Sequence, residues 1–327
     1  MNRRDFLQRS VKWPLGSGLA AACVSGAPYP RCVHGFEAGA VARSRESCHS
    51  SDRTAPIGRI PGSKFKVSLN AYSFNDYLRQ GRMTLYDLVE YCARLQFDAV
   101  DPTAYYFPDY PDVPADRYLV ELKRRAFVNG LAISGTGIRN DFCSPDPEKR
   151  KSDVKLIRNW IRAAAKLGAP VIRIFAGRDL PTGFSRLQVL EWMASGIREC
   201  VRFGRDHGVL VAVQNHNHFL KTSDQILELL TLVDSEWFGL ILDIGSLRSG
   251  DPYEEVEKLV PYALSWQIKE NVYYGERKKE VDLDRLLSIA RKAGYRGYLP
   301  LETLGEGDPR IMVRQFLIRF RDSAGSI

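Results

Sequence analysis

From residue 64 onward, short runs of β-branched and other apolar residues alternate with longer stretches whose apolar residues recur at helical spacing. Apolar runs of this kind, bounded by polar residues, are typical of strands that are covered on both faces of a sheet. The runs predict eight strands, at residues 65–69, 98–101, 131–136, 171–175, 209–213, 239–243, 264–268 and 297–302.

The stretches between these runs predict amphipathic helices. Leu85, Leu88, Val89 and Cys92 fall on one face of the first helix because they are three, four and seven residues apart. The same spacing marks five later stretches: Leu119, Leu122 and Ala126; Val154, Ile157, Ile161 and Ala164; Leu190, Met193 and Ile197; Ile226, Leu229, Leu230 and Val233; Leu283, Leu286, Leu287 and Ala290. Several of these stretches are followed by glycine, a common residue at helix ends: Gly130, Gly168, Gly208 and Gly294.

Regular strand–helix alternation predicts a parallel sheet covered by helices. Eight such units over residues 64–327 fit a single-domain (β/α)8 TIM barrel, which takes about 250 residues. A doubly wound open sheet is the alternative. It would carry a Gly-x-Gly-x-x-Gly phosphate loop after the first strand, and residues 68–72 (Ser-Leu-Asn-Ala-Tyr) contain no such loop. The barrel is therefore the predicted fold.

The first 63 residues have a different composition. Arg3 and Arg4, followed by Asp-Phe-Leu and a weakly apolar stretch at 11–27, resemble a twin-arginine export signal, so we expect residues 1–27 to direct export to the periplasm. A disordered basic N-terminus is the alternative interpretation. Residues 28–63 are rich in Gly, Ala, Ser, Pro and Arg without hydrophobic periodicity, which predicts a flexible linker.

The net charge of +8 does not indicate nucleic-acid binding. Residues 1–60 contribute +5 of it, and the remaining 267 residues hold 38 basic and 35 acidic side chains. No run of about 18 consecutive apolar residues is present, so no membrane insertion is expected after export. The three body cysteines, Cys92, Cys143 and Cys200, are far apart in sequence and are expected to fill the core. The oligomeric state is left open.

Polar residues end the last four predicted strands at corresponding positions. Gln214, Asp243, Gln267 and Glu302 are 29, 24 and 35 residues apart, about one strand–helix unit each. The C-terminal strand ends of a TIM barrel meet at one rim, where active sites lie. Two carboxylates and two amide oxygens suit Mn²⁺, Mg²⁺ or Ca²⁺ better than Zn²⁺. The sequence therefore predicts a weakly bound divalent metal held by these four residues.

Each of these residues also has a purely structural interpretation. Asp243 could cap the next helix, and Gln214 and Gln267 could be solvated loop residues. Glu302 could form an ion pair with Arg173 or Lys269. Their alignment at four successive strand ends favours the functional interpretation.

From Lys66 to its C-terminus, the chain resembles the xylose isomerase-like TIM barrel superfamily of sugar isomerases and epimerases. The resemblance rests on Gly-Ala-Pro-Val-Ile-Arg at 168–173, Gln-Asn-His at 214–216, Leu-Asp-Ile-Gly at 242–245, Gln-Ile-Lys-Glu at 267–270 and Gly-Tyr-Arg-Gly-Tyr-Leu-Pro-Leu-Glu at 294–302.

The resemblance implies a metal set of Glu, Asp, His and Glu on the last four strands. In this chain that set falls on Gln214, Asp243, Gln267 and Glu302, so two of the four positions depart from it. Glutamine at 214 removes a charge and a proton acceptor, and glutamine at 267 replaces an imidazole nitrogen with an amide oxygen. Both changes weaken metal binding, especially of Zn²⁺.

The resemblance also implies proton transfer by two glutamates on opposite faces of a sugar. Because an amide is no general base, only Glu302 remains as such a carboxylate. This favours one-base isomerisation, elimination or hydration over symmetric epimerisation. His216 is the candidate for a second proton-transfer group, or alternatively a neutral residue that orients its neighbours. Lys269 is a candidate for stabilising an enolate, or alternatively an ion-pair partner of Glu270 or Asp243.

Polar residues near the ends of other strands are candidate substrate contacts. An unphosphorylated small-molecule sugar is expected, because no Gly-rich phosphate loop follows the seventh or eighth strand. Amide, carboxylate and arginine side chains hold sugar hydroxyls, and aromatic rings such as Tyr105 stack on sugar C–H faces. The candidate contacts are Asn70, Tyr72, Asp101, Arg139, Arg173 and His218.

Together these features predict a metal-assisted sugar isomerase, epimerase or keto-sugar lyase that acts next to a carbonyl. The alternative is a catalytically silent sugar-binding barrel, which the glutamine at 214 favours. The DNA-repair endonucleases of the same superfold need many histidine and glutamate ligands for a zinc cluster. The body has only His207, His216 and His218, so this branch is disfavoured.

Overall fold

The computed structural model describes residues 55–216 and 218–325, so the predicted signal and most of the predicted linker lie outside the described residues. Within them the strands are β1 (Lys64–Asn70), β2 (Ala99–Asp101), β3 (Ala132–Ile133), β4 (Thr136–Gly137), β5 (Val171–Phe175), β6 (Leu210–Gln214), β7 (Phe238–Asp243), β8 (Ala263–Lys269), β9 (Asn271–Tyr274), β10 (Arg277–Glu280) and β11 (Arg296–Glu302).

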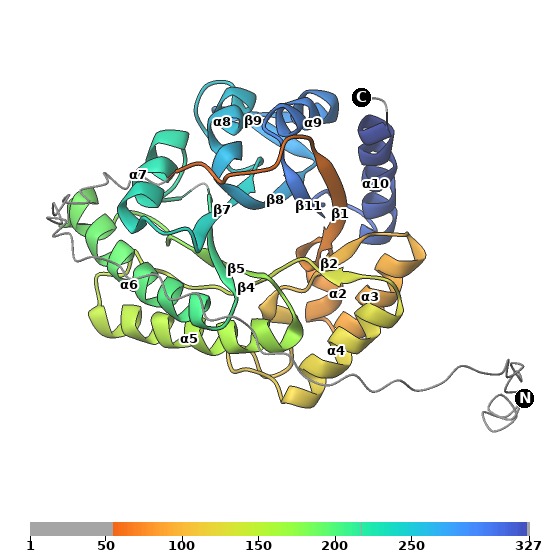
Figure 1. Cartoon of the computed structure of the whole chain (residues 1–327), viewed down its shortest axis with the longest axis horizontal. Helices are drawn as coiled ribbons and strands as arrows, with labels where there is room; N and C mark the ends of the chain where they lie inside the picture. The colour runs from red at the N-terminus through yellow and green to blue at the C-terminus, as the bar shows by residue number, and fades with distance from the viewer. Residues whose placement is uncertain (1–54, 217, 326–327) are drawn as a thin grey trace, which may run out of the picture. The chain divides into compact units, whose positions relative to one another are not determined.

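The helices are α2 (Asn75–Arg79), α3 (Leu85–Arg94), α4 (Asp116–Val128), α5 (Pro147–Leu167), α6 (Arg186–Asp206), α7 (Ser223–Val233), α8 (Pro252–Leu259), α9 (Leu283–Lys292) and α10 (Pro309–Gly325), with 3-10 turns η1 (Ala71–Phe74), η2 (Ala104–Tyr106) and η3 (Val260–Tyr262). They surround the sheet as an outer ring (Figure 1).

The strands form a parallel barrel of eight staves. The sheet order is β3-β2-β1-β11-β8-β7-β6-β5-β4, and its two ends, β3 and β4, are consecutive in the chain. They are separated only by Ser134 and Gly135, and β3 pairs with β2 while β4 pairs with β5. The third predicted strand is thus divided into β3 and β4, and the sheet closes into a barrel at this interrupted strand. The predicted (β/α)8 TIM barrel is confirmed.

Alternation along the strands separates two layers inside the barrel. Val171, Ala212 and Ile241 form a small buried apolar cluster of their own. Two residues farther along β5, β6 and β7, on the same strand faces, stand Arg173, Gln214 and Asp243. The opposite strand faces pack against the helices in the main core. The barrel interior is therefore apolar in the middle and polar at the carboxyl ends of the strands.

The described end of the predicted linker contacts the barrel, although a flexible segment was expected there. Ile57 N donates to Pro261 O at 2.9 Å, and the Arg59 guanidinium donates to Ala263 O at 2.6 Å and lies 5.2 Å from the centre of the Tyr295 ring. These contacts with η3 and the start of β8 hold residues 57–59 against the amino-terminal end of the barrel, so these three residues are not free of it.

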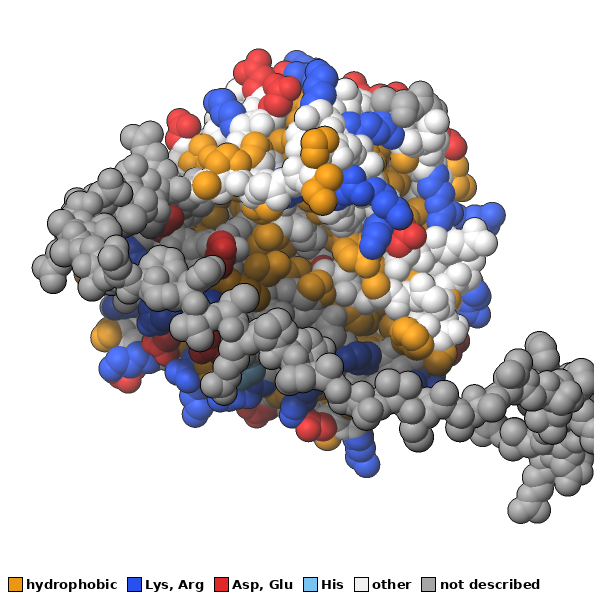
Figure 2. Space-filling view, viewed as in Figure 1, with side chains coloured by type: hydrophobic (Ala, Val, Ile, Leu, Met, Phe, Trp, Pro, Cys, Tyr) orange, Lys and Arg blue, Asp and Glu red, His pale blue; other side chains and the backbone are white. Residues whose placement is uncertain are grey.

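Other expectations can be checked in the described residues. Cys92, Cys143 and Cys200 are free and buried, as expected for core fillers. None of the helices found between residues 55 and 325 is both long and apolar enough to cross a bilayer. Basic and acidic side chains occur together around the visible face in Figure 2.

Candidate active site

An inner pocket of about 170 Å³ opens at the carboxyl ends of the strands. Its lining comprises Asn70, Tyr72, Thr103, Tyr105, Arg139, Arg173, Phe175, Gln214, His216, Gln267, Lys269, Glu302 and Leu304. Nine of the twelve predicted site residues are among them. Asp101, Asp243 and His218 are not, and Thr103, Phe175 and Leu304 are lining residues that the sequence did not single out.

Asp243 is fully buried at the end of β7 and is surrounded by donors. Its Oδ2 accepts from Lys269 Nζ at 2.8 Å, from Gln214 Nε2 at 2.8 Å and from Ser246 Oγ at 2.7 Å. Its Oδ1 accepts from Gly245 N at 3.0 Å. Burial alone would raise the pKa of Asp243, but Lys269 and the hydrogen bonds hold it below its ordinary value.

Lys269, at the end of β8, covers Asp243 on the pocket side. Its Nζ also lies 3.4 Å from Glu302 Oε1, so one ammonium bridges two carboxylates. The Lys269 side chain is 13% exposed, whereas that of Asp243 has no exposed surface. Burial alone would lower the pKa of Lys269, but Asp243 and Glu302 together raise it, so the side chain stays charged.

Glycine at 245 makes room for the lysine stem. A Cβ placed on Gly245 would lie 3.2 Å from Asn271 O and only 2.6 Å from Lys269 Cδ, and the second distance is closer than non-bonded carbon atoms approach. The Leu-Asp-Ile-Gly sequence at 242–245 therefore supplies both the carboxylate that binds the ammonium and the space that lets the stem reach it.

Glu302 is the carboxylate that the pocket exposes. It is buried at the end of β11 and lines the inner pocket. Burial raises the pKa of Glu302, as does Asp243, while Lys269 and Arg173 act in the opposite direction. A carboxylate held partly out of water in this way is a stronger base than an ordinary glutamate.

Asn215 positions Asp243, a role that the sequence analysis did not assign. Its side-chain amide donates to Asp243 O at 2.8 Å and accepts from Asp243 N at 2.8 Å, which continues the β6–β7 pairing beyond Gln214. The residue is fully buried. A buried asparagine directly after a strand was the available signal.

His216 and His218 follow β6 as a stacked pair. Their ring centres are 4.9 Å apart, and the ring of Phe175 meets His216 edge-on at 5.5 Å. Burial lowers the pKa of His216 to about 4, with Asp243 opposing and Lys269 adding to this effect. His216 lines the pocket as a neutral imidazole. His218 lies behind it, 3.9 Å from Asp179, so the structure does not place this predicted substrate contact on the pocket lining.

Arg173 is a buried cation on the opposite side of the pocket. It donates to Ile138 O at 3.2 Å and to the Tyr105 hydroxyl, and its guanidinium lies 4.3 Å from the centre of the Phe175 ring. Burial would lower its pKa, but Tyr105, Asp101 and Glu302 together raise it. Asp101 lies behind the lining, and burial raises the pKa of its carboxyl to about 6 against the effect of Arg173.

Asn70 and Gln267 complete the polar lining. Asn70 Oδ1 accepts from Tyr72 N at 2.8 Å and so fixes the turn that presents Tyr72. Gln267 Oε1 is one of the few buried polar atoms without a hydrogen-bond partner among the described residues. An unpaired buried amide oxygen is costly unless a ligand supplies a donor.

Comparison with known proteins accounts for this architecture. The family model described as xylose isomerase-like TIM barrel matches residues 89–318, which is more than half of the chain. The chain belongs to this family. The xylose isomerase-like resemblance expected from the sequence is therefore confirmed.

Several solved structures share the fold. D-psicose 3-epimerase from Clostridium cellulolyticum H10 is 18% identical over 79% of this chain and 99% of its own, with a TM-score of 0.64. The 3-keto-D-glucoside 4-epimerase from E. coli is 15% identical over 79% and 100%, with a TM-score of 0.62. The probable 3-DHS dehydratase from Bacillus anthracis is 19% identical over 76% and 96%, with a TM-score of 0.59. A search of curated proteins finds no match.

The metal set expected of a xylose isomerase-like protein does not fit the residues present here. Asp243 already accepts four hydrogen bonds and does not reach the pocket. Since a carboxylate can only accept, Gln214 must turn its NH₂ group toward Asp243. Only Gln267 Oε1 and Glu302 remain, too few for a hard divalent cation. Among the described residues there is also no group of three or more His, Cys, Asp or Glu that could hold a metal ion.

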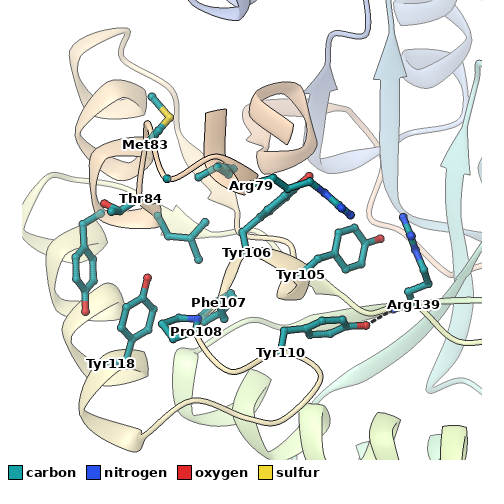
Figure 3. Close-up of a pocket in the computed structure, with 14 residues that line it drawn as sticks. Arg79, Met83, Thr84, Tyr105, Tyr106, Phe107, Pro108, Tyr110, Tyr118 and Arg139 are labelled. Carbon is teal, nitrogen blue, oxygen red and sulfur yellow. Dashed lines mark hydrogen bonds between the residues drawn. The ribbon is translucent and has the colours of Figure 1, made fainter. Parts of the chain in front are cut away.

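An outer pocket adjoins the inner one in this xylose isomerase-like barrel. It measures about 590 Å³ and is rich in tyrosine (Figure 3). Tyr105 and Arg139 line both pockets. The Arg139 guanidinium lies 5.1 Å from the centre of the Tyr105 ring, and Arg139 N donates to the Tyr110 hydroxyl at 3.0 Å. Rings at such a pocket offer flat faces to the C–H surfaces of a ligand.

Proposed function

We propose that this chain is a sugar isomerase or epimerase-like enzyme that moves a proton at a carbon next to a carbonyl. The observation that carries the proposal is Glu302, a carboxylate of raised pKa in a small polar pocket that Lys269, 3.4 Å away, and the buried Arg173 also line. A base of this kind, placed beside positive charge that can stabilise an enolate, is what abstraction of a carbon-bound proton requires.

The reaction is balanced without a further reactant. Glu302 takes the proton from the carbon beside the carbonyl, the electron pair of the C–H bond forms a C=C bond, and the π pair of the carbonyl moves to its oxygen to give an enolate. Glu302 then returns the proton to the neighbouring carbon. His216, a neutral imidazole in the pocket, relays the hydroxyl proton from one oxygen to the other.

The remaining lining residues bind and orient the sugar. Gln267 Oε1, which has no partner in the protein, accepts a hydrogen bond from a sugar hydroxyl. Gln214 takes no proton, because an amide is no base and its NH₂ group is engaged with Asp243. None of these steps involves a metal ion, because the side-chain donors present do not fit the divalent metal that the family resemblance implies.

The substrate is an unphosphorylated sugar with a second group attached to it, as in a glycoside. An inner pocket of about 170 Å³ has room for one sugar ring, and the outer pocket continues past Tyr105 and Arg139. The exposed Arg139 and the tyrosines of the outer pocket suit a second ring with hydroxyls and C–H faces. We expect kcat/KM to be higher for a keto-glycoside than for the matching free keto-sugar.

Export by the twin-arginine route to the periplasm is also part of the proposal. It rests on the Arg-Arg-Asp-Phe-Leu sequence at 3–7. Replacing both arginines by lysine in the full chain should prevent its appearance in the periplasmic fraction of a host that has this route.

The test of the enzymatic function is exchange of carbon-bound hydrogen. The full chain is incubated in D₂O with keto-sugars and keto-glycosides, and deuterium incorporation and new isomers are followed by NMR. Glu302→Gln should lower the rate by about 10²–10⁴-fold. The matched control is Glu306→Gln, an exposed glutamate in the loop after β11, which should leave the rate unchanged.

The rival function is a catalytically silent sugar-binding barrel, which glutamine at 214 favours. It predicts that a sugar raises the melting temperature without any exchange or turnover. This result with every sugar offered would replace the enzymatic proposal.

A further inference from the structure

We propose that the ammonium group of Lys269 is the resident cation of this site, in the place where the family resemblance implies a divalent metal, and that the site binds no metal of its own. The inference deepens the proposed function and rests on it only for the role of Lys269 in turnover. Its metal-binding part can be tested without any substrate.

The position of the ammonium is the first argument. Of the four residues onto which the implied metal set falls, the two that keep a negative charge are Asp243 and Glu302. Lys269 Nζ lies between them, at 2.8 and 3.4 Å. The lysine stands at the end of β8, the strand between β7 and β11 in the sheet. The cation is therefore delivered by the central strand of the three to the carboxylates on its two neighbours.

The two substituted positions agree with a cation of single charge. Glutamine at 214 donates a hydrogen bond to Asp243, so it helps to hold the carboxylate that binds Lys269 instead of facing a metal. Glutamine at 267 is neutral and lacks an imidazole nitrogen. Lys269 already binds Asp243 and Glu302, and the buried Arg173 acts on Glu302 as well, so a divalent ion would add further positive charge in a region of low dielectric.

The space for the lysine is built into β7 and the loop after it. The missing Cβ at Gly245 lets the stem of Lys269 pass, and Ser246 gives Asp243 a further donor at 2.7 Å. Asn215 holds the backbone of Asp243 from the other side. Each of these residues supports the ion pair, and none of them would be needed to expose Asp243 to a metal in the pocket.

The ammonium also has one donor to spare. A protonated lysine carries three N–H donors, and Asp243 and Glu302 account for two. Lys269 lines both the inner pocket and an adjoining pocket of about 230 Å³. The remaining N–H can thus donate to the carbonyl oxygen of a substrate and stabilise the charge that develops on it, which is the task that a metal performs in a metal-dependent isomerase.

The experiment measures metal binding directly, on the full chain. Bound metal is determined by elemental analysis after dialysis, and Mn²⁺ is then added to about 1 mM while the melting temperature is followed. We expect no bound metal and no shift for the parent. The variant Gln214→Glu/Gln267→His/Lys269→Ala restores the ligand set that the resemblance implies and removes the ammonium. It should gain a Mn²⁺-dependent rise of several degrees.

A matched variant, Lys292→Ala, removes an exposed lysine of α9 and should gain no Mn²⁺ response. About one equivalent of metal in the dialysed parent, or a Mn²⁺ response of the parent, would overturn the inference even if the triple variant fails to fold. Loss of turnover on adding EDTA, restored by Mn²⁺, would also overturn it while leaving the proposed function intact. Absence of turnover with all sugars defeats the proposed function alone, because the metal measurements stand by themselves.

Discussion

Lys269 Nζ lies 2.8 Å from Asp243 Oδ2 and covers a carboxylate that has no exposed surface of its own. Two charges taken out of water in this way stabilise a fold only while both are present, because either one alone is left in a region of low dielectric. The two residues come from β7 and β8, neighbouring strands whose register places Asp243 opposite Gln267. The pair therefore depends on the pairing of β7 with β8, which brings together two residues that are 26 positions apart in the sequence.

Removing one member of this pair should be costly. Asp243→Asn leaves Lys269 with Glu302 alone, at 3.4 Å, and should lower the free energy of unfolding by about 3–5 kcal/mol in urea titrations. The double variant Asp243→Asn/Lys269→Met removes both charges and should recover part of this loss.

The control for this prediction is Glu148→Gln, which breaks the fully exposed Lys151–Glu148 pair and should change stability by less than about 1 kcal/mol. Additive losses in the double variant would mean that Asp243 and Lys269 are not coupled, contrary to the geometry.

Gly245→Ala should affect the position of Lys269 more than the stability of the fold. The added Cβ would lie 2.6 Å from Lys269 Cδ, so the stem must move, which displaces the ammonium from its position between the two carboxylates. We expect a stability loss of about 1–3 kcal/mol from overpacking and a fall in kcat/KM of at least about tenfold. Gly58→Ala, where a Cβ meets nothing within 4 Å, is the control and should do neither. An active Gly245→Ala enzyme would argue against a role for Lys269 in turnover.

Activity should depend on the ionisation of Glu302. The base acts only when ionised, so kcat/KM should fall as the pH drops through the pKa of Glu302, which lies above its ordinary value of 4.5 because of burial. Lys269 lowers this pKa, so in Lys269→Met the acidic limb of the pH profile should move to higher pH. A limb at or below pH 4.5, or one that stays in place in the variant, contradicts the assignment of Glu302 as the base.

His216 should make stability depend on pH. Its pKa is about 4 in the fold and 6.5 in its ordinary state, so between these values the unfolded chain binds more protons than the folded one. The contribution of His216 to the free energy of unfolding should therefore fall as the pH is lowered from 6.5 to 4, by about 1–3 kcal/mol at most.

Asp101, whose pKa is about 6, and Glu302, with a raised pKa, give the opposite slope over part of this range, so the effect of His216 is read from the difference between the parent and His216→Gln. Equal slopes in the two proteins would show that His216 is not held neutral.

Most of the barrel could be predicted from hydrophobic periodicity, because each strand is covered by a helix. The expected run at 171–175 coincides with β5, and the run at 239–243 differs from β7 by one residue. The third run is interrupted at Gly135, where a Cβ would lie 3.1 Å from Val171 Cγ1, a close approach that favours glycine. Strand β10 could not be predicted, because all four of its residues are exposed and charged and show no alternation.

The candidate site was predictable in its location but not in its internal pairing. The rule that polar residues follow the carboxyl ends of barrel strands placed nine of the twelve candidates on one pocket. Lys269 had three expected partners, Asp243, Glu270 and Glu302, and Glu302 lies 3.4 Å from its ammonium. The structure selects Asp243, while Glu270 Oε2 accepts from Leu304 N and Gly305 N at 2.9 and 3.1 Å. Neighbouring residues of a strand face opposite sides, which favours different partners for Lys269 and Glu270. The distances to those partners follow only from the folded barrel.

The positive charge that joins Asp243 to Glu302 is attached to the backbone of β8. It is present as soon as residue 269 is incorporated into the chain. Dilution of the protein, a shortage of metal or a competing ion cannot remove it. The size and position of this charge are fixed by the identity of residue 269, so evolution can adjust them only by substituting that residue or the residues that pack around it.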